Sequence, residues 1–274
     1  MKIVTSTCVF PKEMDALDVL PRLARLGFEG IDMDFCYEYE HPTSRFNVIG
    51  LDWAKQVRET AEKLGLTVRY SHAPYDASTR GELVEKTLQC CQIMGVEYTV
   101  VHPIFWREDH TIIESVDEFI ETNANGIRAT LELYEKYNVK ALSENLLWGA
   151  SIKAENIDAL VKEVNSPYFG WCYDTGHANA FKEDHHALIG LENVPEMFHI
   201  QDNNADMRDD HMIPFDGKID WYEFMKIVKE IGYKNDFTLE AHHQSLELPD
   251  DQRDPFLSEL VARSRKLVDF YKTL

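Results

Sequence analysis

The chain has 274 residues, of which 44% are hydrophobic and 28% are charged. This composition supports a large folded core and is unlike that of a disordered chain. Its 28 basic residues face 48 acidic ones, which gives a formal net charge of −20. Binding to a nucleic acid requires clustered Lys and Arg, and the sequence has no basic stripe, so we expect no nucleic-acid partner.

No run of about 18 apolar residues occurs in the chain. The apolar run in the opening stretch MKIVTSTCVF is too short for a signal peptide. We therefore expect no membrane partner. The five cysteines are scattered and form no CxxC pair, which argues against disulfides and against a thiolate zinc site. These features predict a protein of the reducing cytoplasm.

Short runs rich in β-branched and aromatic residues alternate with amphipathic stretches along the chain. The expected strands are residues 2–8, 30–35, 66–72, 97–102, 139–145, 169–174, 197–202 and 236–241. The expected helices lie near residues 15–26, 51–64, 80–94, 113–137, 154–165, 184–190, 220–231 and 255–272. Glycine follows four of these helices, where a left-handed residue commonly ends a helix: Gly27, Gly65, Gly95 and Gly232.

Eight strand–helix units in strict alternation favour an α/β fold of the closed (β/α)8 type, a TIM barrel, over an open doubly wound sheet. A dinucleotide-binding sheet would need a glycine-rich turn after its first strand, and residues 5–14 contain no glycine. No linker or low-complexity segment divides the chain. We therefore expect a single domain over residues 1–274.

Polar side chains end most of the expected strands. Barrel strands are buried on both faces, so polar groups at their carboxyl ends should meet at the mouth, where barrels hold active sites. The strand-end groups are His72, His102, Glu144, Asp174, His199 and Glu240. The expected loop after the sixth strand, within the segment WCYDTGHANAF (171–181), adds His177. The loop after the seventh strand adds two more donors, Asp209 and His211.

Four of these groups, Glu144, Asp174, His199 and Glu240, share one inferred rim and are the candidate metal ligands. Carboxylate and imidazole donors suit Zn²⁺ or Mn²⁺, with Mg²⁺ and Co²⁺ as further options. Without a cation, clustered carboxylates would repel one another and take up protons. The sequence therefore predicts a divalent metal ion as cofactor.

Each polar residue taken alone also fits a structural role, such as a strand cap at His72 or a solvated loop position at His211. Six further histidines are interpreted as surface or supporting groups: His41, His110, His185, His186, His242 and His243. Four aromatic residues fall in expected rim loops, where they would either wall off water or serve ordinary loop packing: Trp106, Trp148, Phe181 and Phe215.

Seven segments together carry a family resemblance: YSHAPY (70–75), VVHP (100–103), SEN (143–145), DTGHA (174–178), FHIQDN (198–203), DDHMIPFDGKIDW (209–221) and LEAHH (239–243). With them the chain resembles the xylose isomerase-like TIM barrel superfamily, which groups sugar phosphate isomerases and epimerases with AP endonucleases of the endonuclease IV type. The likeness runs from the first strand to the last helix. It implies that the four candidate ligands hold one divalent metal. In the endonuclease branch, the matching positions of five more residues complete a three-zinc cluster: His72, His102, His177, Asp209 and His211.

The isomerase branch implies a concrete reaction on a small sugar or polyhydroxy carbonyl compound. The metal chelates the carbonyl and a neighbouring hydroxyl oxygen, acidifies the intervening C–H and stabilises an enediolate. Glu144 and Glu240 would be the catalytic base and acid, and His177 would bind a substrate oxygen. The other histidines of the site would orient the substrate: His72, His102 and His211. Whether copies of the chain form a homo-oligomer is left open.

Other activities stay open beside this one. The nine donors also suit a multinuclear-zinc phosphodiesterase of the AP endonuclease type, although the net charge of −20 opposes DNA and the family's lysine is replaced by Asn203-Asn204. A metal-dependent dehydratase or lyase acting on a cyclic polyol would begin from a similar enolate. A barrel that only binds a sugar would have little need for both glutamates.

The chain departs from the ketose 3-epimerases at two positions. Ala150 stands where those enzymes place a substrate-binding glutamate, and Ala205 stands where they place an arginine. Arg208 lies close enough in sequence to substitute for that arginine. These departures weaken the expectation of a tagatose-type specificity.

Overall fold

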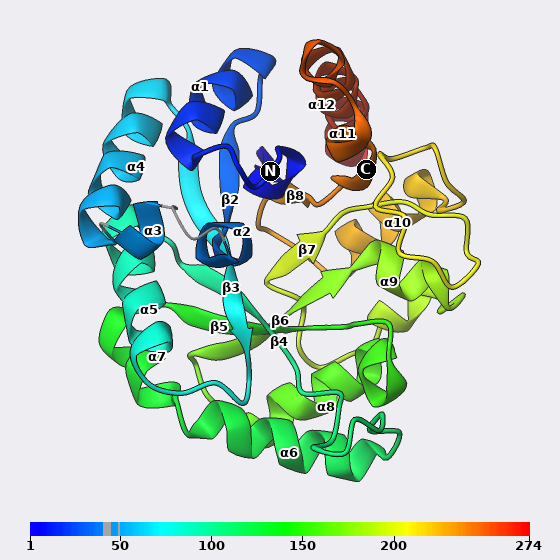
Figure 1. The fold of residues 1–274 in the computed structure, drawn as a ribbon. Helices are drawn as coiled ribbons and strands as arrows, with labels where there is room; N and C mark the ends of the chain where they lie inside the picture. Colours follow the sequence, from blue (N-terminus) through cyan, green and yellow to red (C-terminus); the bar gives the residue numbers. More distant parts are fainter. Residues whose placement is uncertain (41–44, 49) are drawn as a thin grey trace.

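The computed structural model describes residues 1–40, 45–48 and 50–274 (Figure 1). Eight strands form one sheet in the order β7-β6-β5-β4-β3-β2-β1-β8, and the paired strands run parallel. Their bounds are β1 Ile3–Ser6, β2 Gly30–Asp34, β3 Thr67–Asp76, β4 Tyr98–His102, β5 Lys140–Glu144, β6 Phe169–Asp174, β7 Met197–His199 and β8 Phe237–Leu239. His41 lies outside the described residues.

The two edge strands of the sheet, β7 and β8, come together at Ile200, the residue after β7, and this contact closes the barrel. Ile200 pairs with Leu239 in a parallel bridge. The Ile200 N–H donates to the Thr238 carbonyl at 2.9 Å, and the Glu240 N–H donates to the Ile200 carbonyl at 3.1 Å. The predicted (β/α)8 fold is therefore confirmed.

Helices surround the strands (Figure 1). Their bounds are α1 Ala16–Leu26, α2 Phe35–Glu40, α3 Arg45–Val48, α4 Leu51–Leu64, α5 Glu82–Met94, α6 Val116–Arg128, α7 Leu131–Tyr137, α8 Ala154–Val164, α9 Thr175–Ala180, α10 Trp221–Glu230, α11 His243–Glu247 and α12 Asp250–Thr273. Short 3₁₀ helices cover Thr7–Val9, Gly149–Ile152 and His185–Leu188. Within the described parts of the chain, no helix is both long and apolar enough to cross a membrane.

Several local predictions need correction. The helix expected near 113–137 is two helices, and they meet at Thr130, whose N–H donates to the Ile127 carbonyl at 2.9 Å in place of the next α-helical bond. The helix expected near 184–190 is a single 3₁₀ turn. The segment after β6 is the helix α9 rather than a loop, because the Asp174 carboxylate caps the His177 N–H at 2.6 Å. All four predicted helix-ending glycines have positive φ, as expected.

A small apolar cluster fills the inside of the barrel, separate from the large core between strands and helices. Its buried members are Val4, Tyr70, Val100, Leu142, Cys172 and Met197. Side chains two positions apart in a strand point to the same face. Each of the last five members is therefore followed, two residues on, by an inward-facing donor at the mouth: His72, His102, Glu144, Asp174 and His199.

Helix α6 packs closely on the chain that follows β3. A Cβ atom added at Gly126 would lie 2.6 Å from the Ala77 carbonyl oxygen. Alanine usually favours a helix over glycine by up to about 1 kcal/mol. Here we expect Gly126→Ala to destabilise the protein by about 1–3 kcal/mol, because the added methyl group would force the backbone at Ala77 or in α6 to move. Thermal unfolding should show a melting temperature lowered by several degrees, whereas Asn125→Ala, at the exposed neighbouring position, should change it little. An unchanged melting temperature for Gly126→Ala would contradict the close packing.

Candidate metal centre

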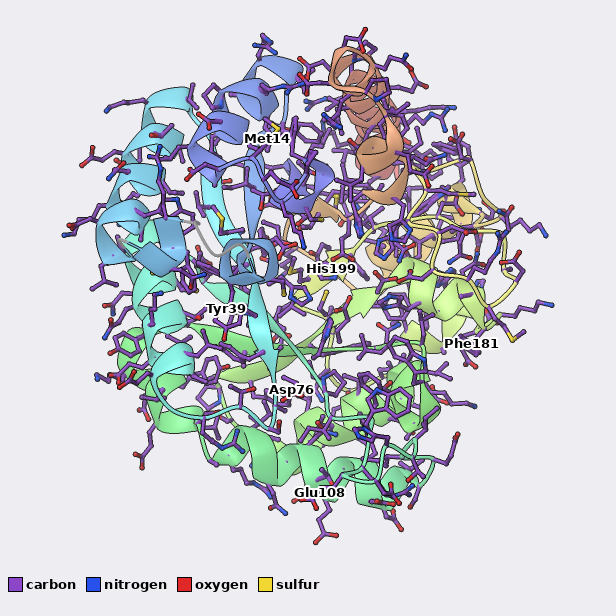
Figure 2. The ribbon with its side chains drawn as sticks, viewed as in Figure 1. Met14, Tyr39, Asp76, Glu108, Phe181 and His199 are labelled. Atoms are coloured by element: carbon purple, nitrogen blue, oxygen red, sulfur yellow. The ribbon has the colours of Figure 1, made fainter. Side chains whose placement is uncertain are left out.

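The predicted polar residues meet at the carboxyl end of the barrel, around a cavity of about 240 Å³. In Figure 2, His199 lies near the centre of the barrel as viewed from this end. Seven of the nine predicted site residues line the cavity: His72, His102, Glu144, His177, Asp209, His211 and Glu240. The other two, Asp174 and His199, are fully buried.

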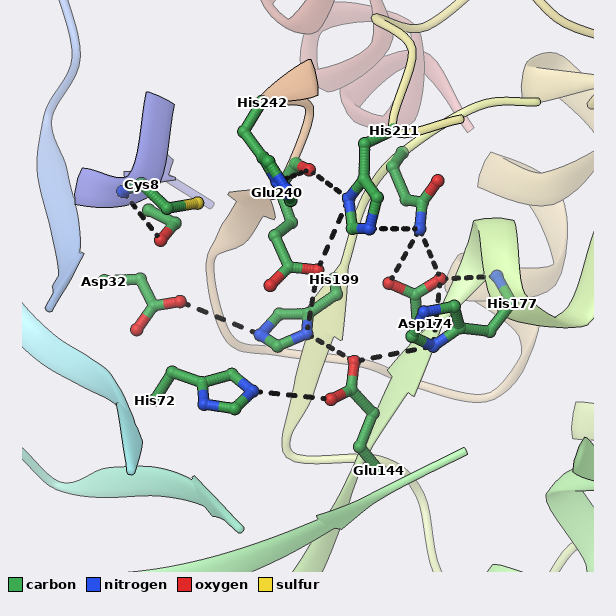
Figure 3. A network of polar contacts seen from close by, with 12 residues as sticks. Cys8, Asp32, His72, Glu144, Asp174, His177, His199, His211, Glu240 and His242 are labelled. Carbon is green, nitrogen blue, oxygen red and sulfur yellow. Dashed lines mark hydrogen bonds and ion pairs between the residues drawn. The ribbon is translucent and has the colours of Figure 1, made fainter. Parts of the chain in front are cut away.

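Four side chains converge most closely. Each of Glu144, Asp174, His199 and Glu240 offers a ligand atom, and these atoms lie within 4.8 Å of one another. His199 Nδ1 lies 2.5 Å from Glu144 Oε1 and 3.4 Å from Glu240 Oε2 (Figure 3). The side chains come from β5, β6, β7 and the residue after β8, so the fold itself brings them together.

Two further groups flank this quartet. On one side, His72 Nε2 and His102 Nε2 lie 3.1 Å apart and face Glu144 Oε2 at 3.7 and 3.4 Å. On the other side, Asp209 Oδ2 lies 3.5 Å from His177 Nε2 and 3.0 Å from His211 Nε2. The ligand atoms of His72, His102 and Glu144 lie within 4.8 Å of one another, and the same holds for His177, Asp209 and His211.

Backbone carbonyls orient three of the histidines. His177 Nδ1–H donates to the Asn145 carbonyl at 2.8 Å, His211 Nδ1–H to the Glu240 carbonyl at 2.7 Å, and His72 Nδ1–H to the Ala73 carbonyl at 3.2 Å. Each Nε2 atom then faces the acidic groups of the cavity. This arrangement is typical of histidines that bind a metal.

Polar neighbours fix the acidic groups as well. The Gln201 amide donates to Asp174 Oδ1 at 3.2 Å and to Asp209 Oδ1 at 2.9 Å. Gly176 makes room for that amide, because a Cβ there would lie 2.2 Å from the Gln201 side chain. Asp202 instead anchors the following loop, accepting from Trp221 Nε1 at 2.8 Å. The FHIQDN segment thus contains both a site-orienting residue and a structural one.

Sequence reasoning missed Asp32, in the middle of β2. Its carboxylate is fully buried, and Oδ2 lies 3.7 Å from His199 Nε2 (Figure 3). In the described part of the chain, neither Asp32 oxygen nor His199 Nε2 has a hydrogen-bond partner. Burying such groups unpaired is costly. A cation on Nδ1 of His199 would leave the Nε2–H directed at Asp32, so these orphaned atoms fit a divalent metal on the other side of the ring.

The two glutamates experience opposite electrostatic environments. Burial raises the pKa of Glu240 to about 7. Burial also acts to raise the pKa of Glu144, but the charge of His199 and hydrogen bonds from His102 and His199 hold that pKa well below its ordinary value. Neighbouring titratable groups whose pKa values are driven apart are typical of acid–base pairs.

The remaining residues singled out from the sequence lie partly at the cavity and partly away from it. Trp148 lines the cavity, whereas Phe215 packs against Tyr222 with ring centres 5.7 Å apart. Arg208 is exposed, pairs with Asp206 at 2.9 Å and does not line the cavity, so it does not replace the missing epimerase arginine. His242, expected to be a surface or supporting group, lines the cavity beside Glu240. Nothing in its sequence position separates it from its exposed neighbour His243.

A family profile described as the xylose isomerase-like TIM barrel matches residues 20–266, and the chain belongs to this family. Among solved structures of the same fold is the IolI protein with a bound zinc atom, at a TM-score of 0.81 and 17% identity over 99% of both chains. A D-tagatose 3-epimerase-like protein has a TM-score of 0.72 and 21% identity, over 98% of this chain and 100% of the other. The 3-keto-D-glucoside 4-epimerase of E. coli has a TM-score of 0.69 and 18% identity, over 96% and 99% of the two chains.

Curated relatives match over a shorter stretch. An uncharacterized protein of Methanocaldococcus jannaschii is 29% identical over 186 residues, which is 62% of each chain. One of Sinorhizobium fredii is 24% identical over 182 residues, 62% of this chain and 55% of the relative. The match therefore spans less than two thirds of either relative.

The site predicts a pH-dependent response to metal. Burial acts to lower the pKa of His211, but the hydrogen bond and charge of Asp209 raise it to about 9. Its protonation stabilises the metal-free fold fully below about pH 6.5, and that contribution is lost as pH rises towards 9. The raised pKa of Glu240 acts in the same direction. Its carboxyl group stays protonated in the folded protein up to about pH 7, so the stability that this proton contributes is lost as pH rises through that value. The melting temperature of chelator-treated protein should therefore fall as the pH rises from 6.5 to 9.

Metal binding displaces these protons, so added Zn²⁺ or Mn²⁺ should raise the melting temperature more at pH 8 than at pH 6. Thermal unfolding of chelator-treated protein, with and without metal, measures both effects. Equal stabilisation at the two pH values would contradict the predicted coupling between protons and metal.

Asp32 should act through His199. Replacing the carboxylate by an amide in Asp32→Asn should weaken Zn²⁺ binding about 10–100-fold, because the ring loses its orienting acceptor. Isothermal titration calorimetry on chelator-treated protein measures the change. Asp158→Asn is the matched control, since Asp158 is also buried but accepts from Asn193 on the outside of the barrel. Equal affinities of Asp32→Asn and the control would exclude this positioning role.

Proposed function

We propose that this protein is a metal-dependent isomerase or epimerase that acts on a small sugar or another polyhydroxy carbonyl compound. The observation that carries the proposal is the pair of glutamates, Glu144 and Glu240, which face one imidazole, His199, from two strands. One glutamate is held ionised and the other has a pKa near neutrality. A carbon acid that loses and regains a proton needs such a pair.

The residues present suit the supporting roles. A divalent cation held by Glu144, Asp174, His199 and Glu240 would supply Lewis-acid polarisation of the substrate oxygens. Glu144, as the ionised partner, would accept the proton from the substrate carbon, and Glu240 would return a proton. His177 and the flanking histidines would bind hydroxyl groups. Trp148 and its leucine neighbours would exclude water: Leu146 and Leu147.

The cavity favours a neutral substrate of about one sugar ring. Its 240 Å³ is below the range of about 300–1,000 Å³ typical of drug-sized ligands. Among the described residues, no Lys or Arg lines it. The net charge of −20 likewise opposes a polyanion. Sugar epimerases among the structures of similar fold support the same class of substrate.

A second candidate is a metal-dependent hydrolase of the AP endonuclease type. It is favoured by the three neighbouring donor groups, which suit two or three ions rather than one. The metal content of the purified protein separates the candidates, since the isomerase proposal expects about one ion per chain. A dehydratase or lyase would share the proton abstraction and differ only in the later loss of water.

Glu240→Gln tests the proposal directly. Purified protein incubated with a ketose panel in deuterated water should exchange deuterium into the carbon beside the carbonyl, as followed by NMR. The variant should lower this exchange about 10²–10⁴-fold while the fold is retained, because the amide cannot carry the proton. Glu247→Gln, at an exposed position in α11, is the control. Undiminished exchange by Glu240→Gln, or none by the unmodified protein on any ketose, would reject the proposal.

A further inference from the structure

A second cavity of about 600 Å³ adjoins the metal centre, and His102 lines both. It lies under the loop between β4 and α6, residues 103–115. In Figure 2, Asp76 and Glu108, which both line it, lie on the side of the barrel facing α6. Any molecule that fills the first cavity past His102 would extend into the second.

Aromatic rings form the boundary between the two cavities. Trp148 lines the first and Phe105 lines the second, and the two rings stack with centres 4.7 Å apart and planes 13° apart. Trp106 continues this aromatic surface into the second cavity, 5.4 Å from Phe105. Both tryptophans are about 40% exposed, at 43% for Trp106 and 39% for Trp148. Exposed aromatic groups of this size commonly mark binding surfaces.

Side-chain hydrogen bonds hold the loop that presents Trp106 at both ends. Arg107 forms two 2.6 Å hydrogen bonds to Glu118 and one of 2.9 Å to the Ile112 carbonyl. Asn123 binds both the N–H and the carbonyl of Ile104, at 2.6 and 3.0 Å. A loop fixed in this way keeps its tryptophan exposed without any gain in core packing. Such preorganisation lowers the cost of binding a ligand.

The chemistry of the second cavity favours an uncharged polyhydroxy ring. Flat aromatic faces can pack against the apolar C–H face of a sugar ring, and the lining also holds polar groups suited to hydroxyls, such as Glu108 and Thr122. Among the described residues of the lining, the one arginine is Arg107; it is paired with Glu118, so its charge is neutralised and offers little to a phosphate. An anionic group is therefore disfavoured here.

We propose that this second cavity is a subsite for the non-reacting ring of a two-ring substrate, a disaccharide or a glycoside. The inference rests on the proposed function for the identity of the reacting ring. The metal centre takes that ring, and Trp106 with Phe105 takes the other. The specificity of the protein is then for a compound larger than a free monosaccharide.

Acrylamide quenching of tryptophan fluorescence tests the subsite without any turnover. The other three tryptophans, Trp53, Trp171 and Trp221, are fully buried, so quenching reports on Trp106 and Trp148. Maltose, cellobiose, lactose and phenyl glucosides are compared with glucose, using the full-length metal-loaded protein. Two-ring ligands should protect the tryptophans and should bind at least about tenfold more tightly than glucose.

Trp106→Ala should remove this tenfold preference, so that two-ring ligands bind no more tightly than glucose. Val194→Ala is the control, because it shortens an exposed apolar side chain on the loop that leads into β7, away from the site. Equal binding of one-ring and two-ring ligands, or a preference that survives Trp106→Ala, would overturn the subsite. Failure of the proposed function would appear separately, as absent deuterium exchange with the binding preference intact.

Discussion

The burial of several carboxylates around one imidazole is the constraint on which the rest of this site depends. Glu144, Asp174 and Asp32 are at most 1% exposed, and all lie near His199. Like charges so placed are stable only with a compensating positive charge, which protons on the histidines or a bound cation can supply. A divalent cation satisfies the donors without protonating them.

The same constraint connects the fold with the proposed chemistry. Parallel strands with inward-facing residues at alternate positions carry an apolar floor, and two residues further on they carry the donors. The floor excludes water beneath the site, and this strengthens each electrostatic interaction above it. The contrast between Glu144 and Glu240 follows from this geometry, because Glu144 lies within 4 Å of four histidines and Glu240 is mainly desolvated.

Much of the barrel could be predicted from the sequence, because buried parallel strands and amphipathic helices differ in period. The convergence of the strand-end donors followed from the fold class, and the structure brings all nine into neighbouring groups, while their roles as ligands and catalysts stay predictions. Short elements were missed where tertiary contacts decide them. Helix α9 depends on the Asp174 cap and on the fit of Gly176 against Gln201.

Asp32 was missed for a different reason. It shares its strand with a second aspartate, Asp34, and only the pairing of β2 with its neighbours directs it towards His199. The boundary between the two cavities also depends on long-range packing, since the stacked rings Phe105 and Trp148 come from loops after different strands. Contacts between side chains from distant parts of the sequence cannot be predicted from hydrophobic periodicity and composition.

Anomalous X-ray diffraction from crystals grown with Zn²⁺ or Mn²⁺ would locate a metal bound at His199. We expect a strong anomalous peak about 2.0–2.2 Å from His199 Nδ1, shared with Glu144, Asp174 and Glu240. A map without a peak at this position, with His199 Nδ1 still bonded to Glu144 at saturating metal, would contradict it.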